Sequence, residues 1–117
     1  MIKTNYEIIK AIVERKSKCN DLSAKGVYKG LSLTRFVYYK LCLDYMKSEY
    51  THTAGAKAIN RGHNHSLRGV KKYDELYNQE FFEYYKSLYV DCTIELLELE
   101  VKINALIRTQ ESEGVAY

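Results

Sequence analysis

The sequence contains no proline and no tryptophan, and it has only three cysteines among 117 residues. Because proline is the strongest helix breaker, its absence predicts one all-α region. Cys19, Cys42 and Cys92 form no C-x-x-C pair and are odd in number. This argues against a disulfide scaffold and favours a reducing, cytoplasmic setting. No apolar run approaches the ~18 residues of a membrane span, and we see no secretory signal, so we expect no membrane partner.

Motifs for catalysis and for cofactor binding are missing as well. The phosphate-binding pattern G-x-x-x-x-G-K-[ST] does not occur. His63 and His65 would point about 200° apart on a helix and cannot easily share a metal ion. Cys42 and Cys92 fall on apolar stripes, which is typical of buried fillers rather than nucleophiles. We therefore predict no enzyme, no metal, no cofactor and no small-molecule substrate.

Charge is divided very unevenly along the chain. Residues 1–73 carry eleven lysines and four arginines against five acids, a net charge of +10. Residues 74–117 carry three basic and ten acidic side chains, a net charge of −7. The basic part suggests a polyanionic partner, whereas the acidic part suits solvent or protein contacts.

Apolar periodicity predicts several helices. We expect helices over residues 5–17, after a capping Thr4, and over 33–49, after a capping Ser32. Between them, residues 25–30 read as a basic, glycine-bounded loop. A break from Thr51 to Thr53 precedes a short helix at 54–59, and a further helix begins near His63.

A longer helix is predicted from about Gln79 to Arg108, followed by a frayed tail at 109–117. Apolar residues occupy every a and d position of its heptads. This pattern leaves two readings open, packing on the chain's own helices or pairing with a second copy. The same pattern separates an N-terminal region at 1–77 from a self-association helix at 78–108 and the tail at 109–117. The predicted self-association residues are Phe82, Tyr85, Tyr89, Cys92, Leu96, Leu99, Ile103 and Leu106.

The stretch from Gly55 to Lys72 is typical of a helix-turn-helix. A segment of small residues is followed by a turn at Asn60 to Gly62 and by a second helix with a polar start. The first residues of such a helix reach base edges in the major groove, and basic side chains around it contact phosphates. The predicted base-reading residues are His63, Asn64, His65 and Arg68. The predicted phosphate-binding residues are Lys25, Lys29, Arg35, Lys57, Arg61, Ser66, Lys71 and Lys72.

This stretch resembles the C-terminal DNA-binding domain of the bacterial replication initiator DnaA. Arg61 and His63 stand where that family has an arginine and a histidine at the start of its recognition helix. The resemblance covers about residues 5–76 and implies a helix-turn-helix bundle of the DnaA domain IV or Trp-repressor type. Its upstream part is carried by Ile8, Ile9, Val13, Asp21, Leu22, Lys25, Arg35 and Leu41.

Several positions depart from that family's pattern. Gly62 replaces a capping aspartate, and Asn64 and His65 replace paired threonines, so the family's own target sequence is not expected. Gly26 and Val27 replace the paired arginines that reach the minor groove in that family.

Two functional hypotheses follow. The first is a sequence-selective double-stranded DNA-binding homodimer with residues 1–77 as its helix-turn-helix DNA-binding domain. It would regulate transcription or a replication origin in the bacterial cytosol, nucleoid or phage-infected cell. The alternative is a protein-interaction module of phage or mobile-element type. In that case the acidic C-terminal helix would bind host replication or virion proteins.

Overall fold

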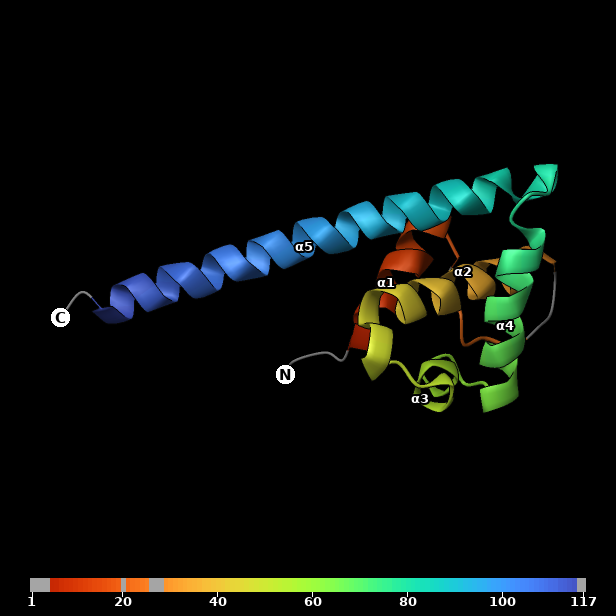
Figure 1. The fold of residues 1–117 in the computed structure, drawn as a ribbon, viewed down its shortest axis with the longest axis horizontal. Coiled ribbons are helices and arrows are strands. Elements are labelled where there is room, and N and C mark those ends of the chain that lie inside the picture. The colour runs from red at the N-terminus through yellow and green to blue at the C-terminus, as the bar shows by residue number, and fades with distance from the viewer. Residues whose placement is uncertain (1–4, 20, 26–28, 116–117) are drawn as a thin grey trace.

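The computed structural model describes residues 5–19, 21–25 and 29–115, and this part of the chain contains helices and turns but no strand. The helices are α1 (Asn5–Ser17), α2 (Lys29–Met46), α3 (His52–Lys57), α4 (His63–Leu76) and α5 (Glu83–Val115) (Figure 1). Short 3-10 turns at Lys47–Glu49 and Glu80–Phe82 connect them. The predicted all-α fold class is confirmed.

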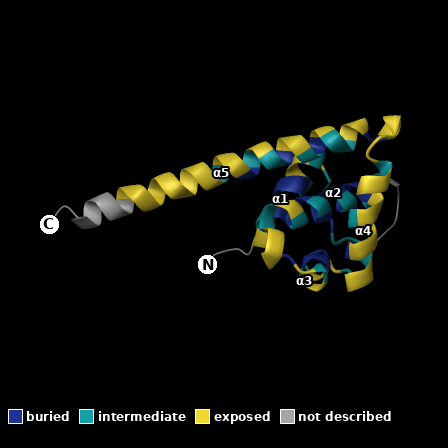
Figure 2. Cartoon of the chain, viewed as in Figure 1, coloured by how far each residue is buried: buried dark blue, intermediate teal, exposed yellow. Residues whose placement is uncertain are grey.

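The hydrophobic core lies between α1, α2 and the first half of α5, while α4 packs across α2 and α3 packs against α4. Figure 2 shows the buried residues gathered in this bundle, and exposed residues along the far half of α5 and over the outer sides of α3 and α4. Ion pairs at the bundle surface link the helices further, since Glu95 of α5 pairs with both Arg15 and Lys16 of α1. Fully buried side chains of the core include Ile9, Val13, Leu22, Val37, Leu41, Ile59, Phe82 and Cys92.

Helix boundaries differ from the sequence-based expectations at α2 and α3. Helix α2 begins at Lys29, not 33, so Ser32 lies inside the helix and does not cap it. Thr34 accordingly donates its hydroxyl to the Gly30 carbonyl at 2.8 Å, as a threonine inside a helix can. The expected break at 51–53 is also shorter, because α3 already begins at His52 with Thr51 as its N-cap.

Helix α5 is longer than expected. It continues through the region predicted to fray and ends at Val115, since without proline nothing in the sequence forces an earlier stop. Its far half projects beyond the bundle (Figure 1), and its residues 101–109 are exposed. In the described part of the chain, no helix combines the length and the apolar character of a membrane span.

The heptad stripe of α5 is only partly available to another copy. Phe82, Cys92 and Leu96 are at most 2 % exposed because they pack into the chain's own core. The prediction that these three side chains mediate self-association is therefore wrong. Of the other predicted positions, Tyr85, Tyr89 and Leu99 are half-buried, and Ile103 and Leu106 are exposed.

Candidate nucleic-acid interface

Helices α3 and α4 are joined by a turn whose backbone ends one helix and starts the other. Thr51 caps α3 by accepting a hydrogen bond from a main-chain N–H of the first turn. Asn60 adopts a left-handed conformation with φ 58°, and the N–H of Arg61 donates back to the Ala56 carbonyl at 2.9 Å. This closure satisfies the carbonyls at the end of α3. Gly62 then precedes α4 and provides no side-chain cap.

Two glycines allow the helices to approach each other closely. A Cβ at Gly55 in α3 would lie 2.6 Å from Cε1 of Tyr50. A Cβ at Gly69 in α4 would lie 2.5 Å from Cδ2 of Tyr39 in α2. Both distances are shorter than any normal carbon contact, so larger residues would push α3 and α4 out of place. Small residues at these positions therefore hold the helix-turn-helix together, as the sequence pattern suggested.

Ser66 lies inside this packing and not on the surface. Its side chain is 0 % exposed and shares hydrogen bonds with the Tyr50 hydroxyl and with Nδ1 of His52, the latter at 2.8 Å. Because a buried hydroxyl cannot reach a DNA phosphate, the prediction that Ser66 binds phosphate is wrong. Its role is to join α3 and α4 through a buried polar network.

His65 also turns toward the protein. Its Nδ1 shares a 2.6 Å hydrogen bond with the Tyr39 hydroxyl, and the two rings meet edge to face. Burial lowers the pKa of His65 below its ordinary value, and the nearby charges of Arg35, Arg61 and Arg68 lower it further. A half-buried, neutral His65 therefore orients α4. It is less available to contact DNA bases than the sequence suggested.

Arg35, predicted to bind phosphate, is a buried part of the scaffold. It is 1 % exposed, and its guanidinium donates to the carbonyls of Leu22 at 2.9 Å and Ala24 at 2.6 Å. The N–H of Leu22 in turn donates to the carboxylate of Glu14 at 2.7 Å. Arg35 thus fixes the loop at residues 21–24 against α1 and α2, and its assignment as a surface phosphate contact is wrong.

The outward face of α4 carries the other predicted base readers. His63, Asn64 and Arg68 are exposed, and Leu67, at 43 % exposure, lies between them. His63 shares a 3.1 Å hydrogen bond with the Thr53 hydroxyl of α3. These residues occupy the first two turns of α4, which is the part of such a helix that reaches base edges.

A cationic cavity opens beside this face, between α2 and α4. Its volume is about 380 Å³. The Arg61 guanidinium, which lines the cavity, donates a 2.8 Å hydrogen bond to the Ala24 carbonyl, while Arg68 is exposed on α4. The positive charges of Arg61, Arg68 and Lys72 around the cavity would attract a nearby phosphate group. The residues around the cavity are Ser32, Arg35, Phe36, Arg61, His65, Arg68 and Lys72.

The remaining predicted phosphate contacts are dispersed. Lys71 and Lys72 are exposed, and both lie near the carboxylate of Glu75, at 4.0 and 3.5 Å. Lys25 and Lys57 are exposed. The side chain of Lys29, together with Gly26 and Val27, lies outside the described residues, so the basic loop keeps only Lys25 as a placed cation.

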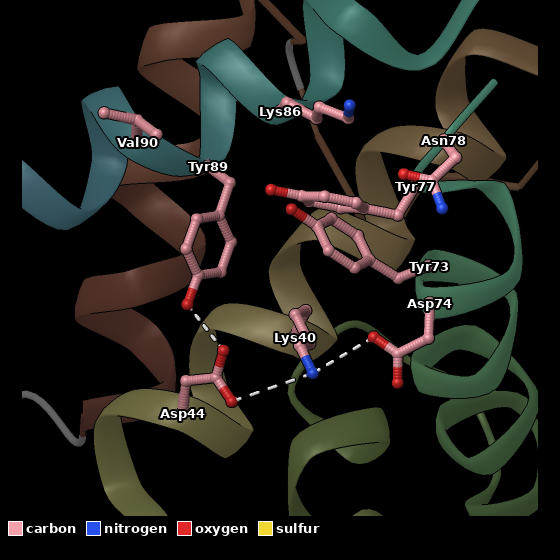
Figure 3. A pocket seen from close by; sticks show the side chains of 9 residues that line it. All are labelled: Lys40, Asp44, Tyr73, Asp74, Tyr77, Asn78, Lys86, Tyr89 and Val90. Carbon is pink, nitrogen blue, oxygen red and sulfur yellow. Dashed lines mark hydrogen bonds and ion pairs between the residues drawn. The ribbon is translucent and has the colours of Figure 1, made fainter.

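A second cavity of about 470 Å³ lies at the opposite end of α4, between α2, α4 and α5 (Figure 3). Lys40 pairs with both Asp44 and Asp74, and the Tyr89 hydroxyl donates to Asp44 at 2.5 Å. Lys86 lies 4.3 Å from the centre of the Tyr77 ring. Because these charges satisfy one another, they are structural contacts. The side chains that line the cavity link α4 and α5 through Lys40 and Asp44 of α2.

Sequence reasoning missed the residues that orient α4, namely Tyr39, Tyr50 and His52. The sequence contains twelve tyrosines, and this number was the available signal. It did not indicate which tyrosine hydroxyl contacts which helix. Among the described residues, no group of three or more His, Cys, Asp or Glu side chains could hold a metal ion, and the three cysteines are free thiols.

No family model, curated protein or solved structure matches this chain.

Proposed function

We propose that the chain binds double-stranded DNA as a homodimer, with the first two turns of α4 in the major groove. The observation that carries this proposal is the placement of His63, Asn64 and Arg68 on one exposed face beside the cationic cavity. The side chain of Asn64 can pair with an adenine edge through both of its amide groups, and Arg68 can pair with guanine. Arg61 and Lys72 would then contact the backbone and set the register.

The charge distribution is consistent with this orientation. The exposed Arg68, Lys71 and Lys72 lie on α4, whereas the acidic α5 begins near one end of α4 and extends away from it (Figure 1). DNA approaching α4 would therefore meet positive charge first, and α5 would remain free for protein contacts. The free thiols favour the reducing cytoplasm as the setting for this activity.

Fluorescence anisotropy with random DNA and with sequences selected from a random pool tests the proposal. We expect binding at low salt, with log K falling by about 0.9 per unit of log salt for each phosphate contact. Asn64→Ala should weaken binding to selected DNA more than to random DNA, whereas Asn5→Ala, at an exposed site on α1, should change neither. Absence of binding to any DNA at low salt would refute the proposal.

A protein-interaction module is the second candidate. Exposed aliphatic side chains on α5, in an acid-rich context, favour it. If DNA binding is absent and a host protein binds the full chain but not the α5 variant Leu97→Glu, this candidate replaces the first.

A further inference from the structure

The outer face of α5 carries four exposed aliphatic side chains in one line, which we name the outer stripe. They are spaced four, three and four residues apart, which places them on a single face of the helix. In a monomer these side chains remain about half exposed or more. The stripe consists of Val90 at 52 % exposure, Ile94 at 49 %, Leu97 at 53 % and Val101 at 68 %.

The outer stripe lies away from the core. Leu88, Cys92 and Leu96 point into the bundle and are at most 3 % exposed. At about 100° per residue, the centre of the stripe is roughly 170° around the helix from the core-facing row. Figure 1 shows the bundle on one side of α5, so a second helix can lie along the stripe without meeting it.

The order of residues in the stripe is symmetrical about its midpoint, which lies between Glu95 and Leu96. Reversing the helix about this point exchanges Ile94 with Leu97. The same reversal exchanges Val90 with Val101. An antiparallel pair of identical helices would therefore place aliphatic against aliphatic at all four positions, as a two-fold interface requires.

The charged residues that flank the stripe follow the same symmetry. Glu83 lies on this face at one end of the helix, and Arg108 lies on it at the other, roughly 37 Å away. Both are exposed, and Glu83 also pairs with Lys86 at 3.1 Å. The same reversal exchanges Glu83 with Arg108. Each end of an antiparallel pair would thus gain a pair of opposite charges, whereas a parallel pair would place like charges together.

We infer that α5 forms an antiparallel homodimer through the outer stripe, with Glu83 of each copy facing Arg108 of the other. The inference rests on the homodimer of the proposed function, but it does not depend on DNA binding. It replaces the heptad seam, because six of the eight residues of that seam are buried or half-buried in the chain itself. The two bundles would lie on opposite sides of the paired helices.

Sedimentation of the full-length chain without DNA tests the interface. Leu97→Glu places a carboxylate against Ile94 at two symmetry-related sites, and we expect it to raise the dimer dissociation constant ~10-fold or more. Leu106→Glu is the matched control, because Leu106 is 65 % exposed on α5 but belongs to the heptad seam. It should change the constant by less than about 2-fold, within the range of a neutral surface change.

The outcomes separate the possibilities. If Leu106→Glu dissociates the dimer and Leu97→Glu does not, the heptad seam is the interface and the inference is overturned. If the wild-type chain is monomeric up to ~1 mM, both the inference and the homodimer fail, while DNA binding is judged by the anisotropy measurement alone.

Charge exchange tests the antiparallel register. Glu83→Arg places like charges at both ends of the pair and should raise the dissociation constant by roughly 3- to 10-fold. Adding Arg108→Glu should restore it to within about 2-fold of the wild-type value. A double variant as weak as the single variant would overturn the antiparallel register.

Discussion

Arg35 and Arg61 both donate to the same main-chain carbonyl, that of Ala24, at 2.6 and 2.8 Å. Arg35 comes from α2 and is buried, whereas Arg61 comes from the turn between α3 and α4 and is half-buried. One carbonyl therefore ties the loop at residues 21–24 to both the core and the helix-turn-helix. The two arginines share a partner and differ in exposure. Buried and exposed arginines of this region should therefore respond differently to mutation.

Replacing Arg35 should affect stability. Arg35→Met removes the donors to two carbonyls, one of them that of the fully buried Leu22. We expect a loss of about 2–4 kcal/mol in the free energy of unfolding, measured by urea denaturation. Arg35→Lys should restore little of it, because an ammonium group cannot reproduce the planar guanidinium geometry. A fully stable Arg35→Met chain would contradict the scaffold role.

Replacing Arg68 should have the opposite pattern. Because Arg68 is exposed, Arg68→Gln should change the free energy of unfolding by less than ~0.5 kcal/mol. It should nevertheless weaken DNA binding. If Arg68 contacts phosphate, the slope of log K against log salt should fall by about 0.9. If it reads guanine, selectivity should fall while the slope stays the same. Unchanged affinity and unchanged slope would remove Arg68 from the interface.

The contrast between Arg35 and Arg68 shows what the sequence could predict. The 3.6-residue periodicity located the helices, and the small residues from Gly55 onward located the helix-turn-helix, because both signals are local. Burial of Arg35 and Ser66 depends on the loop at 21–24 and on Tyr50, which are distant in sequence. Composition alone made these residues look like DNA contacts because they lie in a basic region.

Heptad spacing in α5 failed for a related reason. An a/d pattern records which face is apolar, and it does not record whether that face meets the same chain or another copy. The bundle covers Phe82, Cys92 and Leu96. The outer stripe does not follow the heptad spacing, and its members Leu97 and Val101 lie on the other side of the helix from that face.

Gly69→Ala tests the close approach of α4 to α2. Glycine to alanine normally stabilises an exposed helix by about 1 kcal/mol. Here the new Cβ would lie 2.5 Å from the Tyr39 ring, so we expect a destabilisation of about 1–3 kcal/mol. Gly62→Ala is the control, since nothing lies within 4 Å of its Cβ. Thermal unfolding of both variants measures the difference, and a stabilised Gly69→Ala chain would contradict the packing.

Stability should fall on acidification because of two histidines. Burial lowers the pKa of both His52 and His65 below the ordinary value of 6.5; His63 lowers that of His52 further, and Arg35, Arg61 and Arg68 lower that of His65. Between these lowered values and 6.5 the unfolded chain binds more protons than the folded chain. The stability that these two histidines contribute is therefore fully present above pH 6.5 and is lost as the pH falls through their lowered pKa values. Urea denaturation between about pH 7.5 and 5 measures this slope.

The double variant His52→Gln and His65→Gln identifies the source of that slope. Its free energy of unfolding should be lower at neutral pH, because hydrogen bonds to Ser66 and Tyr39 are altered. Its dependence on pH should be weaker than that of the wild-type chain. An unchanged slope would show that other groups titrate on unfolding.

Ser66→Ala separates the structural role of this hydroxyl from the predicted phosphate contact. The substitution removes a shared partner of Tyr50 and His52 in a buried site, so we expect a loss of about 1–3 kcal/mol in the free energy of unfolding. Tyr50→Phe should lose less when combined with Ser66→Ala than alone, because the two hydroxyls act on each other. For the folded protein, the slope of log K for DNA binding against log salt should stay unchanged, since a buried hydroxyl releases no counterion from DNA. A reduced slope with unchanged stability would instead place Ser66 at the DNA surface.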